Sequence, residues 1–198
     1  MTLFPFFEDI ENKTFLVIGG GKVAAGKIKR LLQFTDNIIV IAEKTDIKGV
    51  EVRKKAFEDS DIFLGDYVIG ATDSSELNSR IASLCKASDI LVNVVDDPQN
   101  CTFIFPSLIK KGDLTIGISS AGKSPAFCKK MRKEIETMLP ENTEEILDKM
   151  GQWREYLKEK EPCKKVRSEV LKSLLSLYLS GENVTRQTVM NLISEIKE

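Results

Sequence analysis

A glycine-rich turn lies between two apolar segments near the N-terminus. Gly19-x-Gly21-x-x-Ala24 follows the apolar run 14–18 and precedes a segment with helical periodicity. The first glycine permits a tight turn, the second lets the backbone approach a pyrophosphate, and the small third residue allows close helix–strand packing. Backbone N–H groups of the first helical turn, at Lys22 and Val23, would face the phosphates. The motif predicts a dinucleotide site; the alternative is a tight turn without a ligand.

An acidic residue stands where the ribose of a dinucleotide would need one. Glu43 follows the apolar run 38–42, about 20 residues beyond the glycine turn. Its carboxylate would accept from ribose hydroxyls and repel a 2′-phosphate, which favours NAD over NADP. The alternatives are that Glu43 is a solvated loop residue and that Lys44 beside it binds a phosphate.

Thr72 and Asp73 follow a further apolar run, 67–71, where cofactor and substrate would meet. Asp73 and Glu76 together resemble a capping box at a helix N-terminus. We expect that role for Asp73, and backbone contacts to the cofactor are compatible with it.

Strand and helix patterns alternate through the first half of the chain, which predicts an α/β fold with a Rossmann-type parallel sheet. A parallel sheet binds its ligand outside the carboxyl ends of the strands. Helices are expected directly after the glycine turn and through 77–84. The expected strands, of which the third lies nearer an edge, are 14–18, 38–42, 50–55, 67–71 and 90–94.

The pattern changes near residue 113. Residues 114–118 alternate as an edge strand does, and a helix is expected from Pro125 to about Met138 with Ser124 as its N-cap. Three amphipathic helices follow. The predicted organisation is a Rossmann domain over 1–113, a small α+β segment over 114–143 and an all-helical C-terminal domain over 144–198.

The composition is that of a soluble globular protein, with 42% hydrophobic and 30% charged residues and a net charge of -1. Nothing global favours nucleic acid or a membrane, and the N-terminus lacks the features of a signal peptide. The four cysteines are widely spaced, so free thiols in a reducing cytoplasm are expected. The absence of histidine from the sequence excludes a histidine base and disfavours a zinc site, so no metal ligands are predicted.

Further motifs occur in a fixed order along the chain. They are Phe4-Pro5-Phe6, the glycine turn, 71–78, Asn93-Val-Val-Asp96-Asp97, Phe103-Ile-Phe-Pro-Ser107 and Ile118-Ser-Ser-Ala-Gly-Lys-Ser-Pro125. Over about residues 3 to 140 the chain resembles the precorrin-2 dehydrogenase and sirohydrochlorin ferrochelatase family, the N-terminal part of sirohaem synthase. The tail matches that family in general character.

The resemblance implies NAD-dependent oxidation of precorrin-2 to sirohydrochlorin in sirohaem biosynthesis, and in some members iron insertion as well. Asp96 matches the family's key acid, which could act as a general base or hold a metal above the tetrapyrrole. Asp97 is a competitor. Strand alternation would point one of the two carboxylates into the cleft, or both could cap a turn before Pro98.

The resemblance also suggests which residues meet the substrate. Asn93 closes the fifth strand. The helix start after Ser124 could bind an acidic side arm of the substrate. Ser120 is modified in some relatives and is interpreted here as a cleft serine, while Thr102 replaces an acidic residue, which weakens a metal site there. The other residues expected at the substrate are Gly122 and Lys123.

The tetrapyrrole carries several carboxylates, so a basic cleft is expected. The alternative for each cation is a solvated helix face. The candidate cations are Lys110, Lys111, Lys123, Lys129, Lys130, Arg132 and Lys133. In the family, residues matching 114–140 exchange between protomers, which implies a homodimer.

Two other functions fit parts of the sequence. Tyr156-x-x-x-Lys160 has the spacing of a short-chain dehydrogenase but lies in the amphipathic tail, where packing is the expected role. A non-catalytic NAD-binding regulatory domain would keep the glycine turn and Glu43 without requiring Asp96.

Overall fold

The computed structural model describes residues 2–197 and divides the chain into two compact units. The first unit is Met1–Phe105 with Ala121–Lys123, and the second is Pro106–Ser120 with Ser124–Glu198. The sequence-based boundary after Asp113 falls later than this division. The reason is that residues 107–111 pair with residues 114–118 and therefore group with the second unit.

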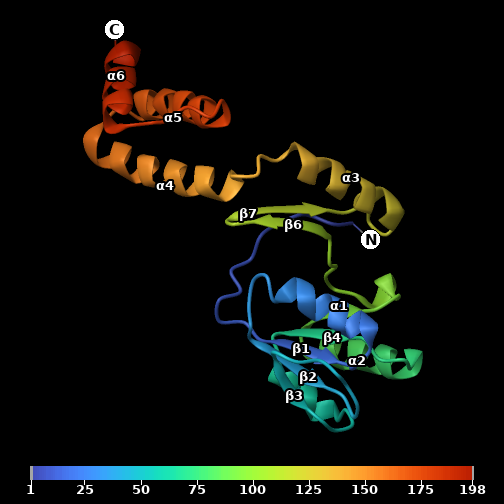
Figure 1. Ribbon diagram of the computed structural model, residues 1–198. Helices are drawn as coiled ribbons and strands as arrows, with labels where there is room; N and C mark the ends of the chain where they lie inside the picture. The colour runs from blue at the N-terminus through green and yellow to red at the C-terminus, as the bar shows by residue number, and fades with distance from the viewer. Residues whose placement is uncertain (1, 198) are drawn as a thin grey trace. The chain divides into compact units, whose positions relative to one another are not determined.

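The first unit is built on a five-stranded parallel sheet with the order β3-β2-β1-β4-β5 (Figure 1). This order confirms the expected Rossmann-type α/β fold, with the third strand at an edge. The chain crosses over between β1 and β4, where a doubly wound sheet binds its ligand. The strands are β1 Phe15–Ile18, β2 Ile38–Ile41, β3 Glu51–Arg53, β4 Tyr67–Gly70 and β5 Leu91–Val94.

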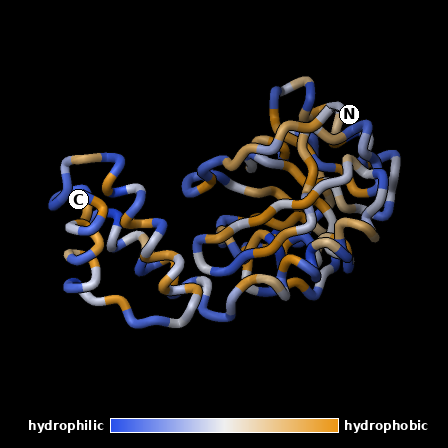
Figure 2. Tube along the Cα trace, turned by 90° about the horizontal axis from the view of Figure 1, so that it is seen from above, coloured by the Kyte–Doolittle hydropathy of each residue, from blue (hydrophilic) through white to orange (hydrophobic). Residues whose placement is uncertain are grey.

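Two helices cover the two faces of this sheet. Helix α1 (Lys22–Leu31) packs on the face that carries Val17 and Ile69, whereas α2 (Ser75–Ala87) packs on the face that carries Leu16 and Val68. Because alternate strand residues point to opposite faces, strands covered on both sides read as continuous apolar runs. The tube in Figure 2 is accordingly orange along these strands. Two short 3₁₀ helices complete the unit, η1 (Asp59–Leu64) and η2 (Pro98–Asn100).

The second unit begins with an antiparallel hairpin of β6 (Ser107–Lys111) and β7 (Leu114–Ile118), followed by α3 (Pro125–Met138). Gly112 has a φ of +52° at the hairpin turn, a conformation that glycine adopts without strain. The strand 114–118 and the helix 125–138 were predicted. Strand β6 was not, because its apolar pair Leu108-Ile109 lies between a proline and two lysines and shows too short a pattern.

Three helices form the rest of the second unit: α4 (Thr143–Lys160), α5 (Lys164–Leu179) and α6 (Arg186–Lys197). They confirm the predicted helical tail. Their own core includes Leu157, Leu174 and Val189, each fully buried. Among the helices of residues 2–197, none is long and apolar enough to cross a membrane.

Candidate functional site

The glycine turn after β1 has the backbone geometry that its sequence predicts. Gly19 has a φ of +118°, and a Cβ there would collide with the carbonyl oxygen of Ala71. A Cβ on Gly20 would lie 2.6 Å from the carbonyl oxygen of Lys44. At Gly21, by contrast, a Cβ would meet no described atom within 4 Å. Two glycines are therefore needed for chain packing, and the third leaves open space beside the start of α1.

An open cavity of about 430 Å³ lies at the carboxyl edge of the sheet, against this turn. Its lining contains most of the residues predicted to bind a cofactor: Gly19, Gly21, Glu43, Lys44, Thr72 and Asp73. Lys22 and Val23 are outside the lining. They form the first turn of α1, whose N–H groups have no partner within the helix. The open space at Gly21 and the free helix start fit a dinucleotide pyrophosphate.

The loops that line the cavity are held by partly buried side-chain hydrogen bonds. The hydroxyl of Thr45 donates to the carbonyl of Gly20 at 3.0 Å. The Thr72 hydroxyl donates to Asn78 Oδ1 at 2.8 Å, and Asn78 Nδ2 donates back to the Thr72 carbonyl at 3.0 Å. Asn78 is 6% exposed. It fixes the loop after β4 and so positions the residues that line the cavity. In the sequence this residue stood out only as the last position of the motif 71–78.

The predicted capping box of Asp73 and Glu76 is wrong. Helix α2 starts at Ser75, and the Oγ of Ser74 accepts from the N–H of Leu77 at 3.1 Å. Ser74 is therefore the N-cap, because the capping side chain must reach the N–H three residues on. Asp73 lies one residue before the cap and lines the cavity.

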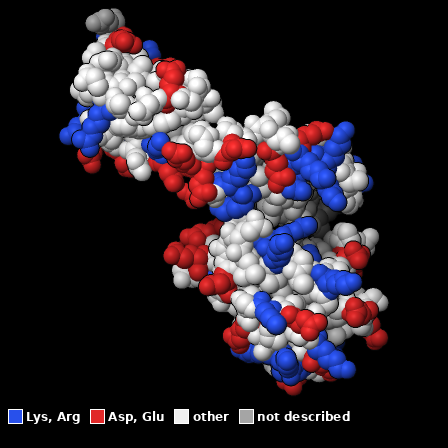
Figure 3. Space-filling model, in the orientation of Figure 1, with Lys and Arg blue, Asp and Glu red and all other residues white. Residues whose placement is uncertain are grey.

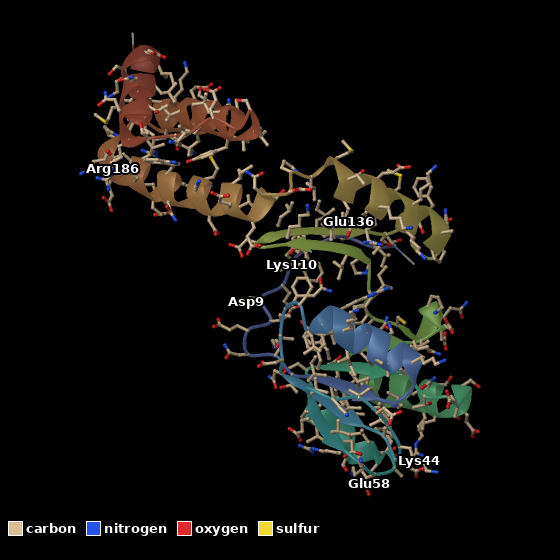
Figure 4. All side chains as sticks on the ribbon, in the orientation of Figure 1. Asp9, Lys44, Glu58, Lys110, Glu136 and Arg186 are labelled. Atoms are coloured by element: carbon tan, nitrogen blue, oxygen red, sulfur yellow. The ribbon has the colours of Figure 1, made fainter. Side chains whose placement is uncertain are left out.

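The cavity presents charges of both signs. Glu43 and Lys44 are exposed side by side after β2, and Lys44 is labelled in Figure 4. Lys55 also lines the cavity, but its Nζ is 2.9 Å from Asp61 and 3.1 Å from Glu58. Those two hydrogen bonds raise the pKa of Lys55, because they favour its charged form.

The two aspartates after β5 have different environments. Asp97 is the N-cap of η2: its Oδ1 accepts from the Asn100 N–H at 3.3 Å and its Oδ2 from Asn100 Nδ2 at 2.6 Å. Asp96 has a φ of +59° and is exposed. The capping alternative is therefore confirmed for Asp97. Strand alternation does not separate the two residues, because β5 has already ended at Val94.

Asn93 is the centre of a polar cluster on the α1 face of the sheet. Its Oδ1 accepts from Lys27 Nζ at 2.7 Å, and its Nδ2 donates to the Phe103 carbonyl at 2.9 Å. The side chain is 5% exposed, so its polar atoms are taken by the protein. The Lys27 amine also lies 4.4 Å from the centroid of the Phe105 ring.

Lys27 was missed by sequence reasoning. Burial, assisted by the charge of Arg30, lowers the pKa of Lys27 to about 8, against opposing effects of Cys101 and Asp96. The signal was present: Lys27 is three residues after Ala24 and four before Leu31, both of which α1 buries. A lysine on the buried side of a helix needs a polar partner.

A thiol braces the turn that carries Asp96. Cys101 Sγ lies 3.2 Å from the N–H of Val94 and 3.2 Å from the carbonyl of Asp97. Burial raises the pKa of this thiol, because it disfavours the charged thiolate. All four cysteines are free, as predicted.

The loop before α3 has the predicted N-cap. Ser124 Oγ accepts from the N–H of Phe127 at 3.2 Å, and Pro125 occupies the first turn. Ser120 Oγ accepts from the Ser124 N–H at 2.9 Å. Between them, Ala121 and Gly122 have φ angles of +51° and +81°. Ser120 thus helps to shape this loop, and Lys123 is exposed on it.

The basic residues of α3 are partly neutralised by their own helix. Arg132 is 2.5 Å from Glu136, and Lys130 is 3.7 Å from Glu134. Lys129 and Lys133, one turn apart, make neither a hydrogen bond nor an ion pair within residues 2–197. Figure 3 shows adjoining Lys and Arg side chains over α3. The two unpaired lysines are the cations of this helix that remain available to a ligand.

Two further expectations concern other parts of the chain. Tyr156 packs edge-on against Trp153 at 5.7 Å, and Arg186 lies 5.9 Å from its ring, so Tyr156 belongs to the helical core of the second unit. Within residues 2–197, no group of three His, Cys, Asp or Glu side chains could hold a metal ion.

Comparison with known proteins identifies related sequences and a related fold. A family model described as "Putative NAD(P)-binding" matches residues 6–107, and one described as "Sirohaem biosynthesis protein central" matches residues 111–138. The chain is 36% identical over 168 residues to a siroheme synthase of Ruthia magnifica, covering 81% of this chain and 36% of that protein. It is 33% identical over 199 residues to a siroheme synthase of Actinobacillus succinogenes, covering 95% and 41%.

The chain thus spans less than half the length of these curated relatives. A solved structure named "SirC, precorrin-2 dehydrogenase" superimposes with a TM-score of 0.74 at 20% identity, over 98% of this chain and 99% of that one. At that identity the match shows a shared fold. Because the model described as "Putative NAD(P)-binding" covers half of the chain, the chain belongs to that NAD(P)-binding family, and the match to the sirohaem model follows it in order.

Proposed function

We propose that this protein oxidises precorrin-2 to sirohydrochlorin with NAD in the biosynthesis of sirohaem. The observation that carries the proposal is the carboxyl edge of the sheet, where an open dinucleotide cavity and the exposed carboxylate of Asp96 follow neighbouring parallel strands. The names of the relatives and of the solved structure support the same reaction. A regulatory NAD-binding domain would have no use for the Asp96 turn.

The reaction removes one hydride and one proton from the macrocycle. NAD, when bound, supplies the hydride acceptor. Asp96 accepts the proton, since its carboxylate is exposed while that of Asp97 is occupied by Asn100. Gly19, Gly21, Lys22, Val23, Thr72 and Asp73 bind the cofactor, chiefly through their backbone.

Paired substitutions test the role of Asp96. Asp96→Asn removes the base and should lower kcat by at least about a hundredfold, while the Kd for NAD stays unchanged. Asp97→Asn is the matched control, because asparagine also serves as an N-cap, and it should keep most of the activity. Equal activity of the two variants in a precorrin-2 oxidation assay would refute the assignment.

We infer a preference for NAD over NADP. Glu43 lies in the cavity lining at the end of β2, where a carboxylate accepts from a ribose and repels a 2′-phosphate. The alternative is that Lys44, the next residue, binds the 2′-phosphate of NADP. The Kd values for NAD and NADP, measured by calorimetry, test this preference. NAD should bind more tightly than NADP, and Glu43→Gln should reduce the ratio of the two Kd values. Tighter binding of NADP by the unmodified chain would contradict the preference.

We also propose that substrate carboxylates bind around the start of α3. Ser124 Oγ caps the N–H of Phe127 and Pro125 has none, so the Ala126 N–H is the first that the start of this helix offers. Gly122 has open space beside it, and Ser120 and Lys123 belong to the same loop. Lys129 and Lys133 add unpaired positive charge. The KM for precorrin-2 should therefore rise with salt, and Lys129→Ala should raise it more than Lys130→Ala, whose lysine is already paired with Glu134. Asn93 acts indirectly, through the cluster that it holds together.

We further propose that the protein works as a homodimer in the cytoplasm. The hairpin β6–β7 forms a sheet of two strands, and Phe127 and Met138 of α3 are 58% and 80% exposed. Two-stranded sheets are marginal alone, and exposed apolar side chains beside one favour coverage by a second copy.

A further inference from the structure

A threonine outside the cavity lining joins the loop after β2 to the glycine turn after β1. The Thr45 hydroxyl donates to the carbonyl of Gly20 at 3.0 Å. The two residues also approach closely through their carbon atoms, since a Cβ on Gly20 would lie 2.6 Å from the Cβ of Thr45. Gly20 lines the cavity, whereas Thr45 does not. Thr45 therefore supports the turn without being part of the cavity wall.

The direction of the Thr45 hydroxyl is fixed by a second hydrogen bond. Its oxygen accepts from the N–H of Ile47 at 3.1 Å. A hydroxyl has a single hydrogen to donate, and here that hydrogen is directed at the Gly20 carbonyl. Ile47 packs against the hydrophobic core on the α1 face of the sheet. The loop that carries Thr45 is therefore anchored to the core close to the point where it holds the turn.

The carbonyl that Thr45 holds belongs to the same peptide group as the N–H of Gly21. This peptide is trans, so its carbonyl and its N–H point in opposite directions. Among residues 2–197 the Gly21 N–H donates to no other group. Because Thr45 holds the Gly20 carbonyl, the Gly21 N–H is turned away from the loop after β2 and is free to donate to a pyrophosphate.

The opposite orientation of this peptide would present the wrong group to a phosphate. A peptide turned over would place the Gly20 carbonyl oxygen where the Gly21 N–H now lies, and both that oxygen and a phosphate are acceptors. The Thr45 hydrogen bond opposes this rotation, because the carbonyl would lose its partner. A donor that already has the bound orientation spares the ligand the cost of ordering it.

We propose that Thr45 is a positioning residue for the cofactor, whose hydroxyl holds the Gly20–Gly21 peptide so that the Gly21 N–H donates to the pyrophosphate of NAD. Thr45 acts through this peptide and does not itself touch the cofactor. The proposal rests on the proposed function for the identity of the dinucleotide and adds a residue to its binding site.

The first experiment measures NAD binding by calorimetry and is independent of turnover. Thr45→Val keeps the branched shape and removes the hydroxyl, so the Kd for NAD should rise about three- to tenfold, the range expected for one hydrogen bond. Thr45→Ser keeps the hydroxyl and should restore the affinity of the unmodified chain. An unchanged Kd in Thr45→Val, or a Kd raised equally in Thr45→Ser, would overturn the proposal.

The second experiment uses parts of the cofactor, titrated while the NMR signals of the labelled protein are followed. ADP carries the pyrophosphate, so its Kd should rise in Thr45→Val by the same factor as the Kd for NAD. Adenosine carries no phosphate, and its Kd should stay unchanged. A general loosening of the loop would also disturb Glu43 and Lys44, and adenosine would then lose affinity as well. An equal loss of affinity for adenosine and ADP would therefore overturn the proposal.

The matched control is Thr35, in the loop before β2. Its hydroxyl oxygen accepts from the N–H of Asn37 at 3.1 Å, just as the Thr45 oxygen accepts from the N–H two residues further along. Thr35 lies at the other end of β2 from the cavity. Thr35→Val should therefore leave the Kd values for NAD, ADP and adenosine unchanged. A rise in Thr35→Val equal to that in Thr45→Val would assign the effect to the lost local turn and contradict the proposed role.

The outcomes separate this proposal from the proposed function. A chain that binds NAD without oxidising precorrin-2 contradicts the proposed function, while the comparison of Thr45→Val with Thr45→Ser still decides the role of Thr45. A chain that oxidises precorrin-2 and binds NAD equally well after Thr45→Val keeps the function and loses the positioning role. If Thr45→Val fails to fold, Thr45→Ala, which also lacks the hydroxyl, takes its place in both experiments.

Discussion

At the scale of single residues, adjacent glycines have different reasons to be glycine. Gly19 has a left-handed φ and faces the Ala71 carbonyl, so its lack of a side chain is a requirement of the fold. Gly21 has an ordinary φ of -82° and open space beside it. The requirement there comes from a ligand that approaches the backbone.

This difference predicts opposite phenotypes for one substitution. Gly19→Ala should lower the free energy of unfolding by at least about 2 kcal/mol, because it combines backbone strain with a collision. Gly21→Ala should cost at most about 1 kcal/mol, as an alanine at an N-cap does, yet weaken NAD binding at least about tenfold. Urea denaturation without cofactor and calorimetric binding measure the two effects. If Gly21→Ala left the affinity for NAD unchanged, the pyrophosphate would not bind against Gly21.

At the scale of elements, the start of α2 shows which residue caps the helix. Ser74 accepts from the Leu77 N–H, whereas Asp73 precedes the cap and faces the cavity. Ser74→Ala should therefore lower the free energy of unfolding by about 1 kcal/mol, and Asp73→Ala by no more than about 0.5 kcal/mol. Both are measured by denaturation without cofactor. A larger loss of unfolding free energy for Asp73→Ala than for Ser74→Ala would support the capping box of Asp73 and Glu76 instead.

The sequence predicted most elements because their signals are local. β1, β2, β4 and β5 are continuous apolar runs, and α3 begins with a Ser-Pro pair that fixes its first residue. β6 was missed, since pairing with β7 is what makes it a strand. The cap of α2 was misplaced by one residue because Asp, Ser and Ser adjoin there and all can cap.

The site was predicted unevenly for a similar reason. Glycines and residues at strand ends are visible in a sequence, since their positions follow from the fold class. The partnership of Lys27 with Asn93 joins residues 66 positions apart, and the occupation of Asp97 by Asn100 depends on a short 3₁₀ turn. The first of these contacts comes from tertiary packing, which no local pattern encodes. The second is local, and the sequence had left it as one of two alternatives for Asp96 and Asp97.

At the scale of the whole molecule, the proposed dimer gives the second unit a role in assembly. The hairpin and α3 expose apolar side chains that a second copy would cover. Light scattering should give twice the 22.2 kDa of the chain, and Met138→Lys, on an 80% exposed side chain, should shift the mass toward one chain. Lys130→Glu, elsewhere on the same helix, is the control. A monomeric mass for the unmodified protein would contradict the dimer.

The central claim is that the dinucleotide cavity and Asp96 serve one reaction on precorrin-2. The measurement that tests it most directly follows NADH and sirohydrochlorin together by absorbance after precorrin-2 and NAD are mixed with the protein. The account predicts that one NADH appears for each sirohydrochlorin, at a rate that Asp96→Asn abolishes. NAD binding without oxidation of precorrin-2 would contradict it and favour a regulatory role for the domain.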